Sequence, residues 1–228
     1  MLYDWAGSRI LKFSVVEDLR RLRMDGQEIR VDMDVRQWLT PSDCSELRKK
    51  TRQLFEPPGQ PPVSPMSYDR RAWLCWKYVV DNFHYSHDGT KDFWQLPQET
   101  LARMSGDCED LSFLLASLLL VGLISPYCVR VVFGDLHTRR SDTEPWLSRG
   151  RHAWVIYKNQ RGRWCILDPT IDSAELPTST PWMEIETPNV ESFSTSIRQY
   201  TPQWCCNRDH AWAIDPAITE WAPGLYRK

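Results

Sequence analysis

The segment Gly106-Asp107-Cys108-Glu109-Asp110 places a cysteine directly after a helix-start signal. Asp107 is a good N-cap residue, so Cys108 is expected in the first turn of a helix. Unpaired backbone N–H groups and the positive end of the helix dipole favour a thiolate there. Glu109 and Asp110 oppose that ionisation by like-charge repulsion, although they complement the helix start. This segment alone is compatible with a nucleophilic cysteine and equally with an inert, capped one.

Two further segments contain the groups that a nucleophilic cysteine needs beside it. His152 opens the strand-like run 152–158, and Asp168 closes the next run, 163–168. The polar residues between the runs are typical of a hairpin turn. His152 and Asp168 should therefore lie nearly opposite one another, about 5 Å apart. Each residue by itself is also typical of a structural role. Together, Cys108, His152 and Asp168 predict a thiol triad in which the aspartate orients the histidine and the histidine acts as base.

The sequence resembles the transglutaminase-like superfamily, especially its bacterial transglutaminase-like cysteine peptidases. Three segments in this order carry the resemblance: Gly-Asp-Cys-Glu-Asp, His-Ala-Trp and Leu-Asp-Pro-Thr. The stretch 92–106 is also similar to the segment that leads into the cysteine of that branch. The resemblance covers roughly residues 68–172. It implies an α+β fold with a papain-like core, in which the helix that bears the cysteine packs on an antiparallel sheet. It also implies a thioester on Cys108 that is released by water or by an amine.

The resemblance extends to the oxyanion hole, for which the backbone N–H of Cys108 is one expected donor. In the wider family an upstream aromatic or polar side chain can add a second donor. Trp94 is the candidate for that donor, and a plain core tryptophan is the alternative. The chain departs from relatives that carry paired Cys-x-x-Cys zinc ligands, and also from relatives with Arg-Gly-Gly before the cysteine.

The elements that must position these residues follow from periodicity and from turn signals. Residues 135–151 predict a long, irregular polar loop, and residues 171–195 predict a second loop. Helices come before most strands in this order, which is typical of an α+β protein. The predicted helices are Ser42–Phe55, Tyr68–Phe83, Pro97–Arg103 and Cys108–Val121, and the further predicted strands are Ile10–Val16, Tyr127–Phe133 and residues 203–214.

A proline-rich stretch divides the chain. Residues 56–65 contain five prolines and a glycine, which excludes a helix or a central strand. The predicted organisation is therefore an N-terminal accessory segment (1–56), a linker (57–66) and a transglutaminase-like catalytic domain (67–228).

The composition of the chain limits which kinds of binding partner are expected. The chain has 228 residues and a formal net charge of −2, so no basic excess predicts binding to nucleic acid or to an anionic membrane. The N-terminus lacks an apolar leader pattern, and the apolar run 111–124 is too short to span a bilayer, so we expect a cytoplasmic protein. Seven irregularly spaced cysteines without Cys-x-x-Cys predict free thiols, with no metal ligand set and no cofactor.

Two other histidine segments could imitate a site. His210 and Asp215 repeat the His-Ala-Trp and Asp-Pro pattern, but five residues along one strand would separate them by about 16 Å on opposite faces. His84 and His87 follow a helix end, and a metal site there would need further ligands.

The predicted function is a thiol hydrolase or acyltransferase that acts on amide bonds of a protein or peptide substrate. A non-catalytic binding module, with residues 1–56 as its contact surface, is one alternative. A protein-crosslinking transamidase is another. Substrate identity and oligomeric state stay open.

Overall fold

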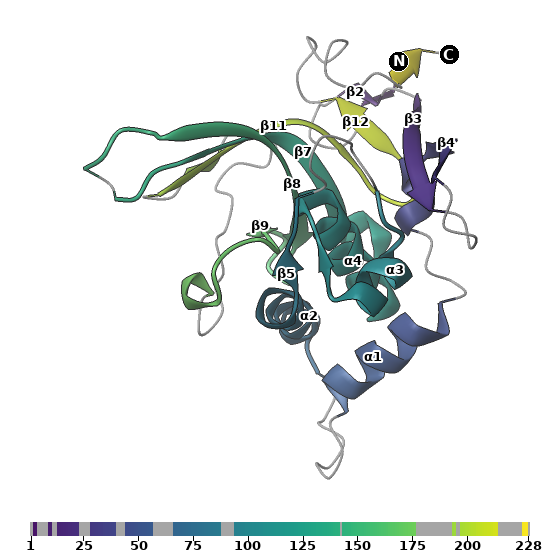
Figure 1. Ribbon diagram of the computed structural model, residues 1–228. Coiled ribbons are helices and arrows are strands. Elements are labelled where there is room, and N and C mark those ends of the chain that lie inside the picture. Colours follow the sequence, from purple (N-terminus) through teal and green to yellow (C-terminus); the bar gives the residue numbers. More distant parts are fainter. Residues whose placement is uncertain are drawn as a thin grey trace.

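The computed structural model describes residues 2–3, 9–10, 13–22, 28–39, 44–56, 66–87, 94–141, 143–176, 193–194, 197–213 and 225–227. Short strands come first, helices follow, and antiparallel strands end the chain (Figure 1). The elements, with η for 3-10 helices, are β1 (Leu2–Tyr3), β2 (Arg9–Ile10), β3 (Phe13–Leu22), β4 (Glu28–Asp34), η1 (Val35–Leu39), α1 (Ser45–Phe55), α2 (Tyr68–Asn82), β5 (His84–Tyr85), α3 (Pro97–Arg103), β6 (Ser105–Gly106), α4 (Cys108–Val121), η3 (Pro126–Cys128), β7 (Val129–Thr138), β8 (Ser148–Lys158), β9 (Trp164–Leu167), η4 (Ser173–Glu175), β10 (Phe193–Ser194), β11 (Arg198–Cys206), β12 (Ala211–Ala213) and β13 (Leu225–Arg227).

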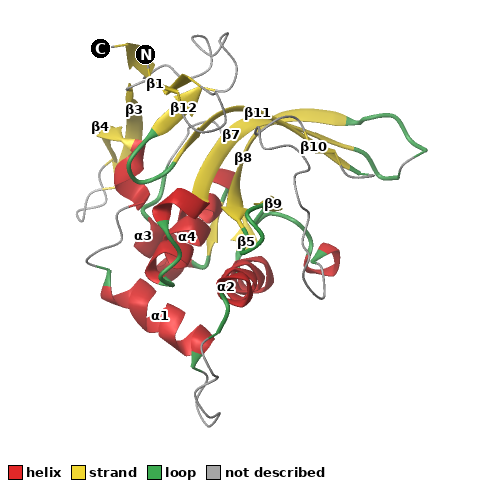
Figure 2. Cartoon of the chain, turned by 180° about the vertical axis from the view of Figure 1, so that it is seen from behind, coloured by secondary structure: helices red, strands yellow, loops and turns green. Residues whose placement is uncertain are grey.

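An antiparallel sheet forms the centre of the molecule. Its strand order is β1-β2-β12-β11-β7-β8-β9, and β10 also pairs with β11. The four strands β11, β7, β8 and β9 lie against the helices, which gather on one side of the sheet (Figure 2). This arrangement is the expected α+β fold, with the helix that bears the cysteine packed on an antiparallel sheet.

Helix α4 is the core of the helical layer. Its residues 109–119 are all buried, because the helix is apolar on nearly every face and is covered by α1, α2, α3 and the sheet. The predicted helix Cys108–Val121 is therefore confirmed, with its start at Cys108. The start of α4 places Cys108 against the middle of β8, near Ala153, which is where the site forms.

The two faces of the sheet have different cores. Ala153, Val155 and Tyr157 belong to the large cluster around α4, whereas Trp154 and Ile156 belong to a second cluster on the other face. This alternation is what period-two side-chain placement requires. Cys206 lies in the first cluster and Cys205 in the second, so these neighbours point to opposite faces of the sheet. All seven cysteines are free of disulfides.

The prediction of an irregular loop at 135–151 is wrong. Strand β7 continues to Thr138 and β8 begins at Ser148, paired with it in register, so only residues 139–147 connect them. The ladder here extends beyond the helical layer (Figure 1), and the side chains of 136–141 are no longer fully buried. A strand pair with no core to cover needs no alternating apolar residues, so its sequence resembles a loop.

The N-terminal part joins the same core as α4. Trp38 is buried, its Nε1 donates to the Gln95 carbonyl at 2.8 Å, and its own carbonyl accepts from Ser117 Oγ at 3.0 Å. The single predicted strand Ile10–Val16 is instead divided between β2 and β3. Residues 57–65 of the predicted linker lie outside the described residues, and the division into three parts stays a prediction.

Within the predicted loop 171–195, the described residues include the short elements η4 and β10. No helix in the described part of the chain has both the length and the apolar character needed to cross a membrane.

Candidate active site

Cys108 is the first residue of α4, and Asp107 occupies the N-cap position, as predicted. The Asp107 side chain makes no capping hydrogen bond, so the helix start is held in another way. Gly106 and Asp110 pack so closely that a Cβ on Gly106 would come within 2.6 Å of the Asp110 Cβ. Asp110 in turn accepts hydrogen bonds from the Gln95 backbone N–H at 2.7 Å and from Gln95 Nε2 at 2.6 Å.

The surroundings of Cys108 disfavour a thiolate. Its side chain is half-buried, and Sγ donates to Glu109 Oε2 at 3.3 Å. Burial raises the pKa of the Cys108 thiol well above its usual value, and the Glu109 and Asp107 carboxylates raise it further; a hydrogen bond from the backbone N–H of Ala153 offsets only part of this. The thiol is therefore neutral at physiological pH, and a nucleophilic role requires a base.

His152 and Asp168 come together at the end of the β8–β9 hairpin. The two side chains form a hydrogen bond, with His152 Nε2 and Asp168 Oδ2 3.0 Å apart. The hairpin register differs by one step from the simple expectation: Val155 pairs with Leu167, so Asp168 lies diagonal to His152 and not opposite it. Diagonal neighbours on one face are still within reach of side chains of this length.

Asp168 is fully buried and surrounded by hydrogen-bond donors. The Tyr200 hydroxyl donates to Oδ2 at 2.8 Å, and the backbone N–H and Oγ1 of Thr170 donate to Oδ1 at 2.9 and 2.8 Å. Arg198 forms an ion pair with Oδ2 at 3.7 Å. Burial opposes ionisation, yet the His152 and Arg198 charges and the donated bonds together hold the pKa of Asp168 well below its usual range. Trp76 Nε1 also holds the Asp168 carbonyl, at 2.8 Å.

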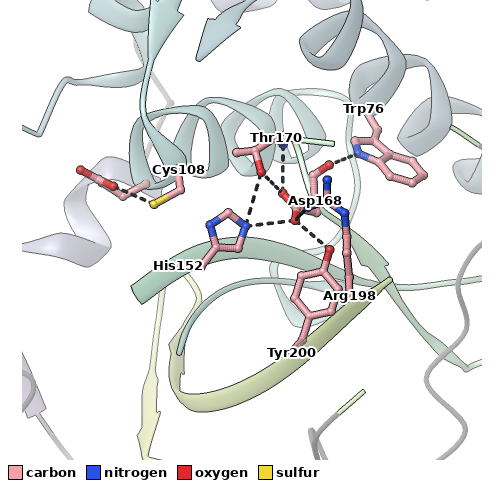
Figure 3. Close-up of polar contacts among 8 residues, drawn as sticks. Trp76, Cys108, His152, Asp168, Thr170, Arg198 and Tyr200 are labelled. Atoms are coloured by element: carbon pink, nitrogen blue, oxygen red, sulfur yellow. Dashed lines mark hydrogen bonds and ion pairs between the residues drawn. The ribbon is translucent and has the colours of Figure 1, made fainter. Parts of the chain in front are cut away.

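This network assigns the protons of the histidine. An ionised Asp168 can only accept hydrogen bonds, so a neutral His152 carries its proton on Nε2 and leaves Nδ1 with a free electron pair. Figure 3 shows Nδ1 on the side of the ring that points toward the Cys108 sulfur. Nδ1 is therefore the ring atom placed to accept a proton from the thiol.

Gly134 allows β11, the strand that bears Arg198 and Tyr200, to approach His152 and Asp168. It pairs with His152 on one side and with Pro202 on the other, beside a register shift in β11 between Pro202 and Trp204. A Cβ at Gly134 would lie 2.2 Å from the Thr201 carbonyl oxygen, so any larger residue forces β11 away. Glycine is required by this close approach of backbones.

Trp94 lies in an aromatic cluster. Its ring stacks on Phe133 at 5.7 Å between centroids and meets Trp38 edge-on at 6.3 Å. Its Nε1 is buried and has no hydrogen-bond partner among the described residues. A donor role for Trp94 in an oxyanion hole stays a prediction.

Three carboxylates at the start of α4 could hold a cation. Asp107, Glu109 and Asp110 are buried, and one oxygen of each lies within 4.8 Å of the others. Hard divalent cations prefer such oxygen ligands. The sequence predicts no metal ligand set, although the acids on both sides of the cysteine are a signal for one. Both Asp110 oxygens already accept hydrogen bonds from Gln95.

The other histidine segments supply no metal site among the described residues. No group of three metal-ligating side chains in the described part of the chain includes His84 or His87, and both are exposed. The backbone N–H of His210 bonds Asn207 Oδ1 at 2.7 Å, and Asp215 lies outside the described residues. The sequence analysis missed Thr170, Arg198 and Tyr200. Thr170 follows Asp168 closely enough to have been found, but the other two come from a strand placed by tertiary pairing.

A family model described as the transglutaminase-like superfamily matches residues 64–169. The chain therefore contains a transglutaminase-like domain, and the matched residues include Cys108, His152 and Asp168. The solved structures it is similar to are distant. LapG from Legionella pneumophila is 17% identical with a TM-score of 0.47, covering 78% of this chain and 83% of that chain. EGTA-treated LapG from the same organism is 16% identical with a TM-score of 0.45, covering 81% of this chain and 86% of that chain.

A candidate cysteine protease from Cytophaga hutchinsonii is 14% identical with a TM-score of 0.38, covering 82% of this chain and 83% of that chain. No curated protein matches the chain. Likenesses at this level carry no conclusion about activity.

Proposed function

We propose that this protein is a thiol hydrolase or acyltransferase of peptide or isopeptide bonds, with Cys108 as nucleophile, His152 as base and Asp168 as orienting group. One observation carries the proposal: His152 Nε2 is bound to Asp168 at 3.0 Å while Nδ1 points toward the Cys108 sulfur (Figure 3). Cys108 is partly exposed, whereas Asp168 is fully buried.

The first step forms the thioester. Nδ1 of His152 takes the thiol proton as Sγ attacks the amide carbon, and the carbonyl electron pair moves onto oxygen. The ionised Asp168 stabilises the imidazolium that results. When the carbonyl re-forms, the C–N bond breaks and His152 gives its proton to the leaving amine. The neutral thiol described above fits this order, because deprotonation accompanies attack and does not precede it.

The second step releases the acyl group. His152 takes a proton from water as the water oxygen attacks the thioester carbon. When the carbonyl re-forms, the C–S bond breaks and His152 returns that proton to the sulfur, which leaves the Cys108 thiol and a free carboxylic acid. An amine in place of water gives a new amide by the same proton transfers.

A release assay tests the proposal. The wild-type chain is incubated with a panel of peptide and isopeptide substrates, with and without an added primary amine, and compared with C108A, H152A and C128A. Cys128 is also a half-buried thiol, so C128A is the matched control. Wild type and C128A should release product, while C108A and H152A should release none above background.

Three other outcomes would change the conclusion. Equal release by wild type and C108A would overturn the thioester mechanism. Release of amine-linked product in place of acid would indicate a transamidase. An inactive wild-type chain over the whole panel would favour a non-catalytic binding module.

A further inference from the structure

Tyr85 is brought beside Cys108 by a short parallel pairing. In strands β5 and β6, Tyr85 stands in register with Gly106, two residues before the nucleophile. Backbone bonds hold the pairing on both sides: His84 N–H donates to the Met104 carbonyl at 3.1 Å, and Ser86 N–H donates to the Gly106 carbonyl at 3.0 Å. Because this strand pair runs directly into α4, the position of Tyr85 is fixed relative to the start of that helix.

The Tyr85 side chain stands at the exposed rim of the site. It is 45% exposed, and its ring meets His87 edge-on with centroids 4.8 Å apart. The register with Gly106 places Tyr85 beside the start of α4, where its hydroxyl interacts electrostatically with the Cys108 thiol and with the Asp107 and Glu109 carboxylates. The phenol is therefore a partly exposed hydrogen-bond donor beside the helix start that bears Cys108.

The charges around the sulfur explain why a donor is needed there. Attack on a carbonyl creates an oxyanion next to Cys108, where Asp107 and Glu109 already oppose negative charge. Ionised carboxylates cannot donate hydrogen bonds, whereas a phenol can. Burial, followed by the charges of Cys108 and the two carboxylates, raises the pKa of Tyr85 far above its usual value, so its proton is held at any working pH.

We propose that Tyr85 is a further catalytic residue, whose phenolic O–H donates to the oxyanion formed when Cys108 attacks a carbonyl, together with the Cys108 backbone N–H. The inference rests on the proposed function. During attack the S–C bond forms and the carbonyl electron pair moves to oxygen, which accepts the Tyr85 hydrogen bond without taking the proton. The bond weakens again when the carbonyl re-forms and the leaving group departs.

Two probes that share the nucleophile separate this role from others. p-Nitrophenyl acetate acylates a cysteine through an oxyanion and releases p-nitrophenolate. Iodoacetamide alkylates the same sulfur by displacing iodide, with no oxyanion. Both rates are measured at Cys108 for wild type, Y85F, C108A and the control Y127F, whose exposed tyrosine lies at η3. The adducts are located by mass spectrometry.

The expected result is that Y85F lowers the ratio of acylation rate to alkylation rate at least tenfold, since one oxyanion donor contributes about 10²–10³ in rate. Y127F should leave the ratio unchanged. A Y85F ratio within twofold of wild type overturns the inference, whether the two rates are unchanged or fall together. If wild type is acylated no faster than C108A, the proposed function itself fails, and the role of Tyr85 fails with it.

Discussion

The surroundings of Asp168 favour its ionised form, whereas the surroundings of Cys108 favour the neutral thiol. Asp168 has no exposed surface, and its contacts from His152, Thr170, Tyr200 and Arg198 all favour the ionised carboxylate. Cys108 is half-exposed, and the carboxylates beside it oppose ionisation of the thiol. The orienting half of the site is thus fixed in its charged state by the fold, while the nucleophile is kept neutral.

In the proposed mechanism, this difference means that Cys108 depends on an oriented base to lose its proton. A pre-ionised thiolate would need a positive environment, which the start of α4 does not supply once Asp107 and Glu109 are present. A neutral thiol needs a well-oriented base in place of a favourable field. The dense network around Asp168 meets that need, because it fixes both the tautomer and the direction of the His152 ring.

The largest expected effect comes from removing the charge of Asp168. In D168N the new amide presents N–H groups toward donors at His152 and Tyr200, so His152 loses its tautomer and orientation. Activity should fall about 10³–10⁴-fold, measured as acylation of Cys108 by p-nitrophenyl acetate. D172N, at an exposed aspartate nearby in sequence, is the matched control. Activity within tenfold of wild type would contradict the orienting role.

The same variant should alter acid stability. The folded pKa of Asp168 lies below that of an unfolded aspartate, about 3.9, so this group contributes stability that is complete above about pH 4 and is lost as the pH falls further. D168N should therefore be less stable than wild type at neutral pH, and the gap should narrow toward about pH 2 in chemical denaturation.

The next largest effect is expected at Gly134, where the backbone of β7 lets β11 approach Asp168. G134A places a Cβ against the Thr201 carbonyl and should lower the free energy of unfolding by about 2–3 kcal/mol. G150A is the matched control, because a Cβ there meets nothing within 4 Å in the same hairpin. Denaturant unfolding measures both, and equal effects would show that the close approach is not required.

A single donor to Asp168 should have a smaller effect. Y200F removes one bond to a buried charge and should cost about 1–2 kcal/mol of stability in denaturant unfolding. The exposed Tyr127 supplies the control, Y127F. No difference between the two variants would mean that Arg198 and Thr170 alone suffice to hold the carboxylate.

The smallest effect is expected at the Cys108 end. E109Q removes a charge that raises the pKa of the thiol, so alkylation by iodoacetamide at about pH 8 should become several-fold faster. E144Q, at an exposed glutamate in the β7–β8 connection, should not change the rate. Slower or unchanged alkylation of E109Q would contradict the electrostatic contrast between the two ends.

Local sequence determined the three residues of the proposed triad and the elements that carry them. Cys108 follows a helix-start signal, and His152 and Asp168 flank a hairpin, so their placement depends on short-range rules of capping and turns. The apolar run after Cys108 likewise predicted a buried helix, and α4 has its whole middle inside the core.

Only the tertiary structure decided what surrounds them. Tyr200 and Arg198 reach Asp168 because β11 pairs with β7, a partner about 60 residues earlier in the chain, and no local pattern sets that register. Tyr85 reaches Cys108 through two-residue strands too short to show periodicity. The diagonal placement of Asp168, the ladder at 135–151 and the neutral state of the thiol depend likewise on pairing and burial. Residue type and spacing thus identified the residues of the proposed triad, and long-range packing set their charges and their hydrogen-bond donors.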